Sequence, residues 1–241
     1  MKLFRADLHI HTVLSPCASL EMSPKKIIEE ALKKGINMIA VTDHNITLNV
    51  EPTFMLGKKN HITVIPGTEI CSNEEVHSLA FFPDIDALRK FQEYLNSVYS
   101  NILNTDHTFG YQLVVDQEEN IISEIDILLS NSLTTSLKEV EKKIHEYDGL
   151  FVPSHINRPS NSVLSQLGFI PDDLEIDALE IAKPFNEEFI DKYYDYTIIK
   201  NSDAHTIEQI GMTYNSMLME SCKFSELKKA LEMSEGREVI I

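Results

Sequence analysis

The chain has 241 residues, 43% of them hydrophobic and 24% charged, an ordinary globular composition that excludes a disordered or fibrous protein. Its formal charge is -17, from 38 acidic and 21 basic residues. This charge opposes binding of a long polyanion, because affinity for nucleic acid rests on neutralising phosphates with Lys and Arg. We therefore expect no long nucleic acid as a partner.

The apolar runs, the N-terminal residues and the cysteines indicate the cellular location of the protein. No apolar run approaches the roughly 20 residues of a membrane helix, so we expect no membrane partner. Met1 to Arg5 lead straight into a strand-like segment and leave no room for a cleavable secretion signal, which predicts a cytoplasmic protein. Cys17, Cys71 and Cys222 are odd in number and lack CxxC spacing, so we expect reduced thiols.

The first predicted strand covers residues 6–12. Alternate residues of a strand face the same side, so Asp7, His9 and His11 project together while Leu8 and Ile10 face a core. Two imidazoles beside carboxylates suit a divalent transition metal such as zinc, manganese or iron. The combination recurs near the other end of the chain, at residues 203–205.

Strands and helices alternate along the rest of the chain. Ser23 and Pro24 predict the start of a helix that ends at Gly35, and Ser136 with Glu139 fits a capping box. Further helices are predicted over 88–98 and 137–147. The remaining six predicted strands cover residues 36–42, 62–65, 76–82, 149–155, 176–181 and 196–202, and the third of the seven strands leads through Pro66 and Gly67 to residues 68–70.

This alternation predicts an α/β fold, with a parallel sheet covered on its outside by helices. The length suits one α/β barrel of about 250 residues, so we expect a single domain over residues 1–241. Residues 85–148 are more than one crossover helix requires and predict a helical insertion or lid between the fourth and fifth strands. The sequence does not indicate the oligomeric state.

Potential metal ligands stand at the ends of these apolar runs. In parallel α/β barrels the chemistry collects at the carboxyl ends of the strands, where His44, His155, Asp203 and His205 would fall. A lone HxH triplet is weak evidence, and a single histidine usually needs no ligand role. Several ionisable groups at the ends of buried strands would be costly unless they pair or coordinate, so the set predicts one metal site.

Four ordered motifs resemble those of the PHP (polymerase and histidinol phosphatase) family across nearly the whole chain. Glu69 and His77 fill the two other expected positions, and the motifs are His9-Ile10-His11, Thr42-Asp43-His44, Pro153-Ser154-His155 and Ser202-Asp203-Ala204-His205. The resemblance implies a distorted (β/α)7 relative of the larger barrel and a cluster of two or three divalent metal ions (Zn, Mn or Fe).

The resemblance also implies how the ligands divide among the metals. The first ion would take His9, His11, Glu69 and Asp203, and the second would share Glu69 and add His77 and His155. The third would lie between His44 and His205. Relatives often offer a histidine or aspartate shortly after the HxH pair, where this chain has Cys17, which is either a thiolate ligand or a compact packed residue. Asp7 would orient a histidine or cap the strand.

The implied activity is that of a metal-dependent phosphoesterase, which hydrolyses a small phosphomonoester or nucleotide with a metal-activated hydroxide. Asp203, His205 and Arg158 would take part in catalysis, Arg158 as a planar cation for phosphate in the loop after a ligand-bearing strand. Lys183 is a weaker candidate for phosphate. We expect His61, His107 and His145 to be surface or packing residues.

Two alternatives stay open. An amidohydrolase-type metal hydrolase also opens with HxH on a barrel strand, although its metals share a carbamylated lysine where this chain offers Glu69. A non-catalytic, metal-stabilised scaffold is the second alternative. Turnover of phosphoesters and amides with added manganese would separate these functions.

Overall fold

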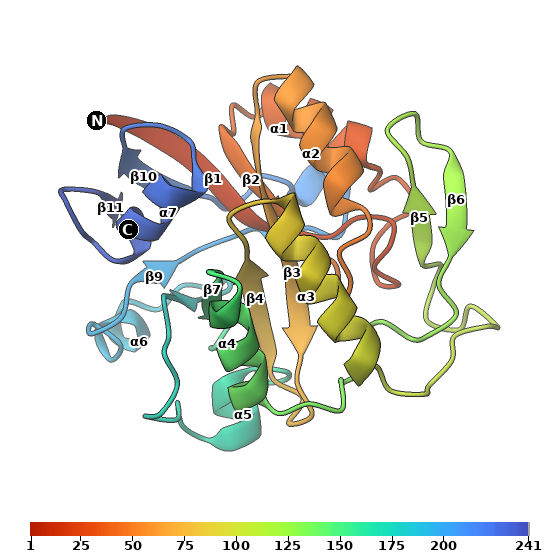
Figure 1. Cartoon of the computed structure of the whole chain (residues 1–241). Coiled ribbons are helices and arrows are strands. Elements are labelled where there is room, and N and C mark those ends of the chain that lie inside the picture. Colours follow the sequence, from red (N-terminus) through yellow and green to blue (C-terminus); the bar gives the residue numbers. More distant parts are fainter. Residues whose placement is uncertain (241) are drawn as a thin grey trace.

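The computed structural model describes residues 1–240 and has a curled, mixed seven-stranded sheet at its centre (Figure 1). The order in this sheet is β11-β10-β1-β2-β3-β4-β7. The strands are β1 (Lys2–Ile10), β2 (Met38–Val41), β3 (Thr63–Cys71), β4 (His77–Phe81), β7 (Leu150–Pro153), β10 (Asn215–Met219) and β11 (Glu238–Ile240). The α/β class is confirmed, and the sheet forms a half-barrel.

The prediction of an all-parallel sheet is wrong for part of it. β1, β2 and β3 run parallel, whereas β4 is antiparallel to both β3 and β7, and β10 is antiparallel to β1 and β11. Only residues 72–76 join β3 to β4. A parallel crossover needs a dozen residues or more, so this short connection produces a hairpin.

A separate two-stranded parallel sheet, β8 (Leu179–Glu180) and β9 (Ile198–Ile199), lies between β7 and the end of β1. The backbone N–H of Asp177 donates to Phe151 O at 3.0 Å, and that of Ile156 donates to Glu180 O at 2.9 Å. On the other side, His11 N donates to Ala204 O at 2.9 Å. Segments far apart in the sequence thus meet at one end of the sheet.

Seven α-helices surround the sheets in the described residues, and a 3-10 turn, η1 (Ile207–Gln209), follows β9. They are α1 (Pro24–Lys33), α2 (Val50–Lys59), α3 (Ile85–Val98), α4 (Leu137–Glu146), α5 (Val163–Leu167), α6 (Glu187–Asp191) and α7 (Phe224–Leu231). The predicted signals are confirmed: Ser23 caps α1 with Pro24 in its first turn, and Ser136 with Glu139 forms the capping box of α4. α1 and α2 lie side by side (Figure 1).

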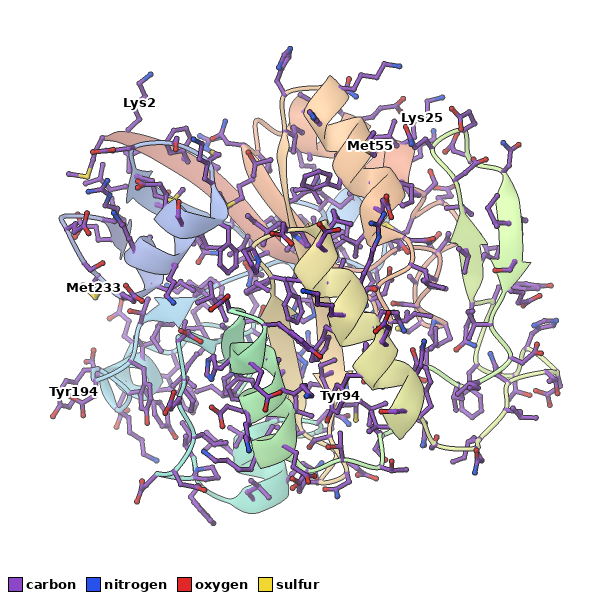
Figure 2. All side chains as sticks on the ribbon, in the orientation of Figure 1. Lys2, Lys25, Met55, Tyr94, Tyr194 and Met233 are labelled. Atoms are coloured by element: carbon purple, nitrogen blue, oxygen red, sulfur yellow. The ribbon has the colours of Figure 1, made fainter. Side chains whose placement is uncertain are left out.

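Buried apolar side chains fill the space between the sheet and these helices. One cluster packs α3 and α4 on the sheet through Phe91 and Ile144, a second contains the strands and α7, and a third lies beneath α1. Polar ends point outward at the periphery, as Figure 2 shows for Lys2 and Tyr194, and Tyr194 is 80% exposed. This packed scaffold holds the strand ends in fixed positions.

The predicted insertion, residues 85–148, contains both core-packing helices and a projecting part. α3 and α4 cover the sheet, while the antiparallel hairpin of β5 (Leu113–Val115) and β6 (Ile121–Glu124) stands at the edge of the molecule (Figure 1). The fold does not test the role of this segment as an insertion or a lid, which stays a prediction.

Candidate metal centre

Glu69 is the centre of the site. This residue of β3 is 1% exposed, and its two carboxylate oxygens face imidazoles from four other segments of the chain. The distances are 3.4 Å to His9 Nε2, 3.5 Å to His11 Nε2, 3.2 Å to His44 Nδ1, 3.2 Å to His77 Nδ1 and 3.2 Å to His155 Nε2. The structure therefore brings five of the predicted histidines to one buried carboxylate.

Asp203 forms a second close group with His9 and His11 beside Glu69. Its Oδ1 lies 3.2 Å from His9 Nε2 and 3.2 Å from His11 Nε2, and the two Nε2 atoms are themselves 3.2 Å apart. The backbone at Asp203 has φ +48°, and that at His155 has φ +31°. Non-glycine residues rarely adopt these values, and such strain is concentrated at functional sites.

Hydrogen bonds to the outer ring nitrogens fix which atoms face the centre. His9 Nδ1 lies 2.9 Å from Glu180 Oε1, and a carboxylate can only accept, so Nδ1 carries the proton. His11 Nδ1 lies 2.9 Å from the hydroxyl of Ser15, which itself donates to Asp43 at 2.6 Å and must accept from the ring. In the neutral tautomers that these bonds select, both Nε2 atoms direct a lone pair to the centre.

This arrangement fits divalent cations. Two imidazole lone pairs and a carboxylate oxygen within 3.2 Å of one another repel unless a cation lies among them. His155 Nδ1 is also buried without a hydrogen-bond partner, and His44 Nδ1 faces Glu69 without hydrogen-bond geometry. Three overlapping groups can hold an ion: His9 with His11 and Glu69, His44 with Glu69 and His77, and His11 with His44 and His205.

Glu69 and His11 have the ionisation states that bind a metal ion, whereas His9 and His44 would each release a proton on binding one. Burial by itself would lower the pKa of both rings, but Glu180, Asp203 and Glu69 raise that of His9 well above its ordinary value, and Cys17 and Glu69 raise that of His44 to about 10. Burial by itself would raise the pKa of Glu69, but the surrounding histidines, His77 foremost, hold it well below its ordinary value. Burial, together with the nearby rings of His205 and His44, lowers the pKa of His11. A charged carboxylate and neutral imidazoles are the forms that bind a metal ion.

His205 and Cys17 stand at one side of the centre. The ring centroids of His11 and His205 are 4.2 Å apart, and His205 Nδ1 lies 2.9 Å from the backbone oxygen of Asp203. The Cys17 thiol contacts His44 and His205; burial would raise its pKa, but these contacts lower it to about 6. Whether Cys17 is a ligand or a compact packed residue stays a prediction.

Arg158 lies at the rim, as predicted, but not as a free surface cation. Its Nη2 is 2.6 Å from Asp203 Oδ2, and its side chain is 41% exposed. The loop is braced by Asn157, whose side chain bonds both the N–H and the C=O of Ala182. Lys183 is exposed and donates from Nζ to Met212 O at 3.1 Å, which places it in the adjoining loop and outside the ligand cluster.

Asp7 does not contact a histidine ring, so its predicted role of orienting one directly is wrong. It accepts from the N–H of Ser202 at 3.0 Å, from the Ser202 hydroxyl at 2.7 Å and from the N–H of Gly211 at 2.8 Å. Burial raises the pKa of Asp7 to about 6 despite these bonds. Asp7 instead holds the segment that carries Asp203 and His205.

The sequence did not identify Glu180 as part of the site. It is 2% exposed and also accepts from His155 N at 2.9 Å and Asn201 Nδ2 at 2.8 Å, so one carboxylate connects three ligand-bearing segments. An acid at the end of the apolar run 176–181 was the available signal. Ser15 and Asp43 were likewise not assigned, although Asp43 precedes a predicted ligand.

The three remaining histidines lie outside this centre. His107 pairs with Glu124 at 3.1 Å in an exposed position, and His61 is exposed. His145 of α4 joins Glu141 and Asp177, and Asp177 accepts from the backbone N–H of Phe151 in β7. No described helix is long and apolar enough to cross a membrane.

Comparison with known proteins agrees with the site. The family model described as PHP domain matches residues 7–232. YqxK of Bacillus subtilis (strain 168) is 26% identical over 275 residues, which cover 100% of this chain and 65% of YqxK. The lesion-specific endonuclease PfuEndoQ of Pyrococcus furiosus superposes with a TM-score of 0.76 at 22% identity, over 100% of this chain and 58% of that one.

A second structure corrects the expected partner. Endonuclease Q, in complex with a 27-mer duplex substrate that has an abasic lesion at the active site, superposes with a TM-score of 0.78 at 22% identity over 99% of this chain and 58% of that chain. The prediction that a long nucleic acid is excluded is therefore wrong. Net charge describes the whole surface, whereas bound cations and a few rim residues determine the local field at a site.

Proposed function

The chain belongs to the PHP domain family, whose members are metal-dependent hydrolases, and on that premise we propose that it is a phosphoesterase acting on phosphodiester bonds of nucleic acid. The observation that carries the proposal is the meeting of His9, His11 and Asp203 beside Glu69, with the imidazole lone pairs directed inward. The duplex bound by Endonuclease Q supports the choice of substrate class. This chain spans only 58% of that protein, so its own substrate requires direct measurement.

We assign two or three divalent ions, zinc, manganese or iron, to the centre. His9, His11, Glu69 and Asp203 would hold the first; His77 and His155 would hold the second with Glu69 as the shared carboxylate; His44, His205 and Cys17 would hold the third. Such ions, when bound, lower the pKa of a water and neutralise charge on phosphoryl oxygens.

The chain's own residues would position the phosphate. The Arg158 guanidinium lies at the rim next to Asp203 and can hold two phosphoryl oxygens in its planar fork. His205 and Asp203, with side chains 26% and 9% exposed, lie between this rim and the buried ligands. Their placement makes Asp203, His205 and Arg158 the candidate catalytic residues.

The test compares substrates on one metal-loaded preparation. A duplex oligonucleotide with an abasic site, an undamaged duplex, single-stranded RNA, a phosphomonoester and an amide are each incubated with protein reconstituted with manganese, zinc or iron. We expect cleavage of at least one nucleic acid. Turnover of the phosphomonoester alone would reject the substrate class, amide hydrolysis alone would favour the amidohydrolase alternative, and no turnover at all would favour a scaffold.

Two variants separate catalysis from folding. His9→Ala and Asp203→Ala remove ligands at the convergence and should abolish hydrolysis, while far-ultraviolet circular dichroism stays unchanged. The matched control is His107→Ala, which removes an exposed histidine that contacts Glu124 and Tyr111, outside the ligand cluster, and should keep full activity. Unchanged turnover in either ligand variant would contradict the assignment.

A further inference from the structure

The backbone of β5 joins the β5–β6 hairpin to the rest of the molecule. The N–H of Leu113 donates to Val13 O at 3.1 Å, and the C=O of Leu113 accepts from Asn49 Nδ2 at 3.0 Å. The N–H of Val115 donates to Asn49 Oδ1 at 3.0 Å. β6 pairs with the other side of β5 and lies outermost in Figure 1. β6 is therefore the edge strand of this two-stranded sheet.

The free side of β6 offers backbone groups that can bond to another strand. Opposite residues of an antiparallel pair either bond to each other or turn their N–H and C=O groups outward. Leu113 uses both of its groups to bond to Val13 and Asn49, so its cross-strand partner Glu124 also turns its N–H and C=O away from the pair. Within residues 1–240, neither group of Glu124 bonds to another segment of the chain.

The same side of the chain is already paired two residues after Glu124. Asn104 N donates to Asp126 O at 2.8 Å, and Leu128 N donates to Ile102 O at 2.9 Å, as in an antiparallel ladder. Residues two apart in a strand face the same way, so Glu124 and Asp126 share this side. The protein's own pairing thus ends at Asp126 and leaves the next position, Glu124, open to a strand of another molecule.

The edge at β6 is apolar and lacks the usual protection against pairing. All four residues of β6 are exposed, and Ile121 and Ile122 are 64% and 63% exposed. Exposed edges are commonly protected by lysine or proline, but residues 116–126 contain neither. Isoleucine favours extended backbone. These features are typical of an edge that pairs with a further strand.

The charge around this edge is negative. Residues 91–137 contain no Lys or Arg. In the described part of the chain, only Lys25 and His107 form ion pairs with the local acids, Lys25 at 3.8 Å from Glu119 and His107 at 3.1 Å from Glu124. A second copy of the chain would bring the same negative charge, and nucleic acid would bring phosphates, whereas a basic segment is complementary. The acids of the hairpin and the segments beside it are Asp106, Asp116, Glu118, Glu119, Glu124 and Asp126.

We propose that β6 is a docking edge for an extended segment of a partner protein, in which basic residues alternate with apolar ones. The segment adds to the hairpin as a third strand beside Glu124. Main-chain hydrogen bonds provide the affinity, and the basic side chains provide the specificity through the surrounding carboxylates. The inference does not rest on the proposed function, because the hairpin contributes none of the proposed metal ligands.

A synthetic peptide tests the inference on the unmodified protein. The probe is a fluorescein-labelled peptide about eight residues long, the length of a strand, which alternates lysine with valine. Fluorescence anisotropy measures its Kd at low and at high salt. We expect saturable binding that weakens at high salt, since exposed charges are then screened. The same peptide with glutamate in place of lysine should not bind, and N-methylation of alternate backbone nitrogens on one edge should weaken binding about tenfold or more.

Two variants at one position separate backbone pairing from charge. Glu124→Pro and Glu124→Gln both remove the carboxylate that contacts His107, but only proline removes the N–H that faces the open side. An edge strand tolerates proline where the N–H faces solvent, so circular dichroism should show the fold kept in both variants. We expect Glu124→Gln to retain most of the affinity and Glu124→Pro to lower it about tenfold or more.

The contrary outcomes are specific. Equal affinities of Glu124→Pro and Glu124→Gln, or of the plain and N-methylated peptides, overturn strand addition, and equal binding of the lysine and glutamate peptides overturns the charge requirement. A homodimer that light scattering detects and Glu124→Pro dissociates would make a second copy the occupant. A duplex oligonucleotide that displaces the peptide would make nucleic acid the occupant, and either result overturns the proposal.

Discussion

Glu180 should determine how tightly the centre holds its metal, although it is not one of the proposed ligands. Its two oxygens accept from His9 Nδ1, at 2.9 and 3.1 Å, from Asn201 Nδ2 and from the backbone N–H of His155. Glu180→Gln keeps the size of the side chain but turns one oxygen into an amide donor. That donor must face another donor, Asn201 Nδ2 or His155 N.

The magnitude follows from these contacts. Loss of the carboxylate that orients a metal-binding histidine typically lowers metal affinity about 10–100-fold, or about 1.4–2.8 kcal/mol. A buried donor left without an acceptor costs roughly 1–3 kcal/mol of folding free energy. Glu180→Gln should therefore weaken Zn²⁺ binding at the His9 site by one to two orders of magnitude and also destabilise the fold.

Competition with a chromophoric chelator measures the affinity, and urea unfolding measures the stability. The control is Glu226→Gln, which changes a mostly buried carboxylate, 7% exposed against 2% for Glu180, that accepts from Arg237 at 3.0 Å and contacts none of the proposed ligands. It should lose stability and keep the metal affinity. The reasoning is refuted if Glu180→Gln binds Zn²⁺ as tightly as the unmodified protein, or if both variants lose affinity equally.

Three further results are expected. Removing metal with a chelator should lower the unfolding temperature by about 5–10 °C relative to protein held with free metal at a hundredfold excess over its Kd, because metal binding then contributes about 2.7 kcal/mol. Calorimetry measures this shift, and an unchanged unfolding temperature would argue against a metal at this centre. The hydrogen bond to Asp177, opposed by burial and aided by Glu141, raises the pKa of His145. The stabilisation from protonated His145 is therefore complete below the unfolded pKa of 6.5 and is lost as the pH rises through the folded pKa. In urea unfolding, His145→Gln should cost on the order of 1 kcal/mol more at pH 6 than at pH 9. Equal losses at both pH values would contradict this expectation. A Cβ on Gly110 would collide with the backbone oxygen of Pro16, so Gly110→Ala should lower the free energy of unfolding in urea by more than Gly168→Ala, which has φ +80° but open space around it; equal losses in the two variants would contradict the packing argument.

The ligands could be predicted from the sequence because the two-residue repeat of a strand and the position of a residue at the end of an apolar run are local properties. His9 and His11 share a face of one strand through the two-residue repeat, and His155 and Asp203 follow apolar runs. Partners of these ligands were not predictable in the same way. Glu180 reaches His9 across 171 positions, and no local pattern indicates which acid will lie behind which imidazole.

The hydrophobic pattern also does not indicate whether a strand runs parallel or antiparallel to its neighbours. Apolar runs of four to five residues are alike in parallel and antiparallel pairs, so the sequence predicts β4 as part of a parallel sheet. His77 begins β4, as the predicted strand over 76–82 implies. The short turn before it reverses the chain, which brings the first residue of β4 to the end of the sheet where Glu69 lies in β3.

The reversal of β4 explains how a mixed sheet assembles the same centre that a parallel barrel would. Because β4 is antiparallel to both neighbours, β3 and β7 still run in the same direction, and their carboxyl ends carry Glu69 and His155 to one edge. His77 enters that edge from the amino end of the strand between them. An insertion that lengthened the β3–β4 turn would displace His77, so the second ion should bind more weakly while binding at His9 and at His205 is kept.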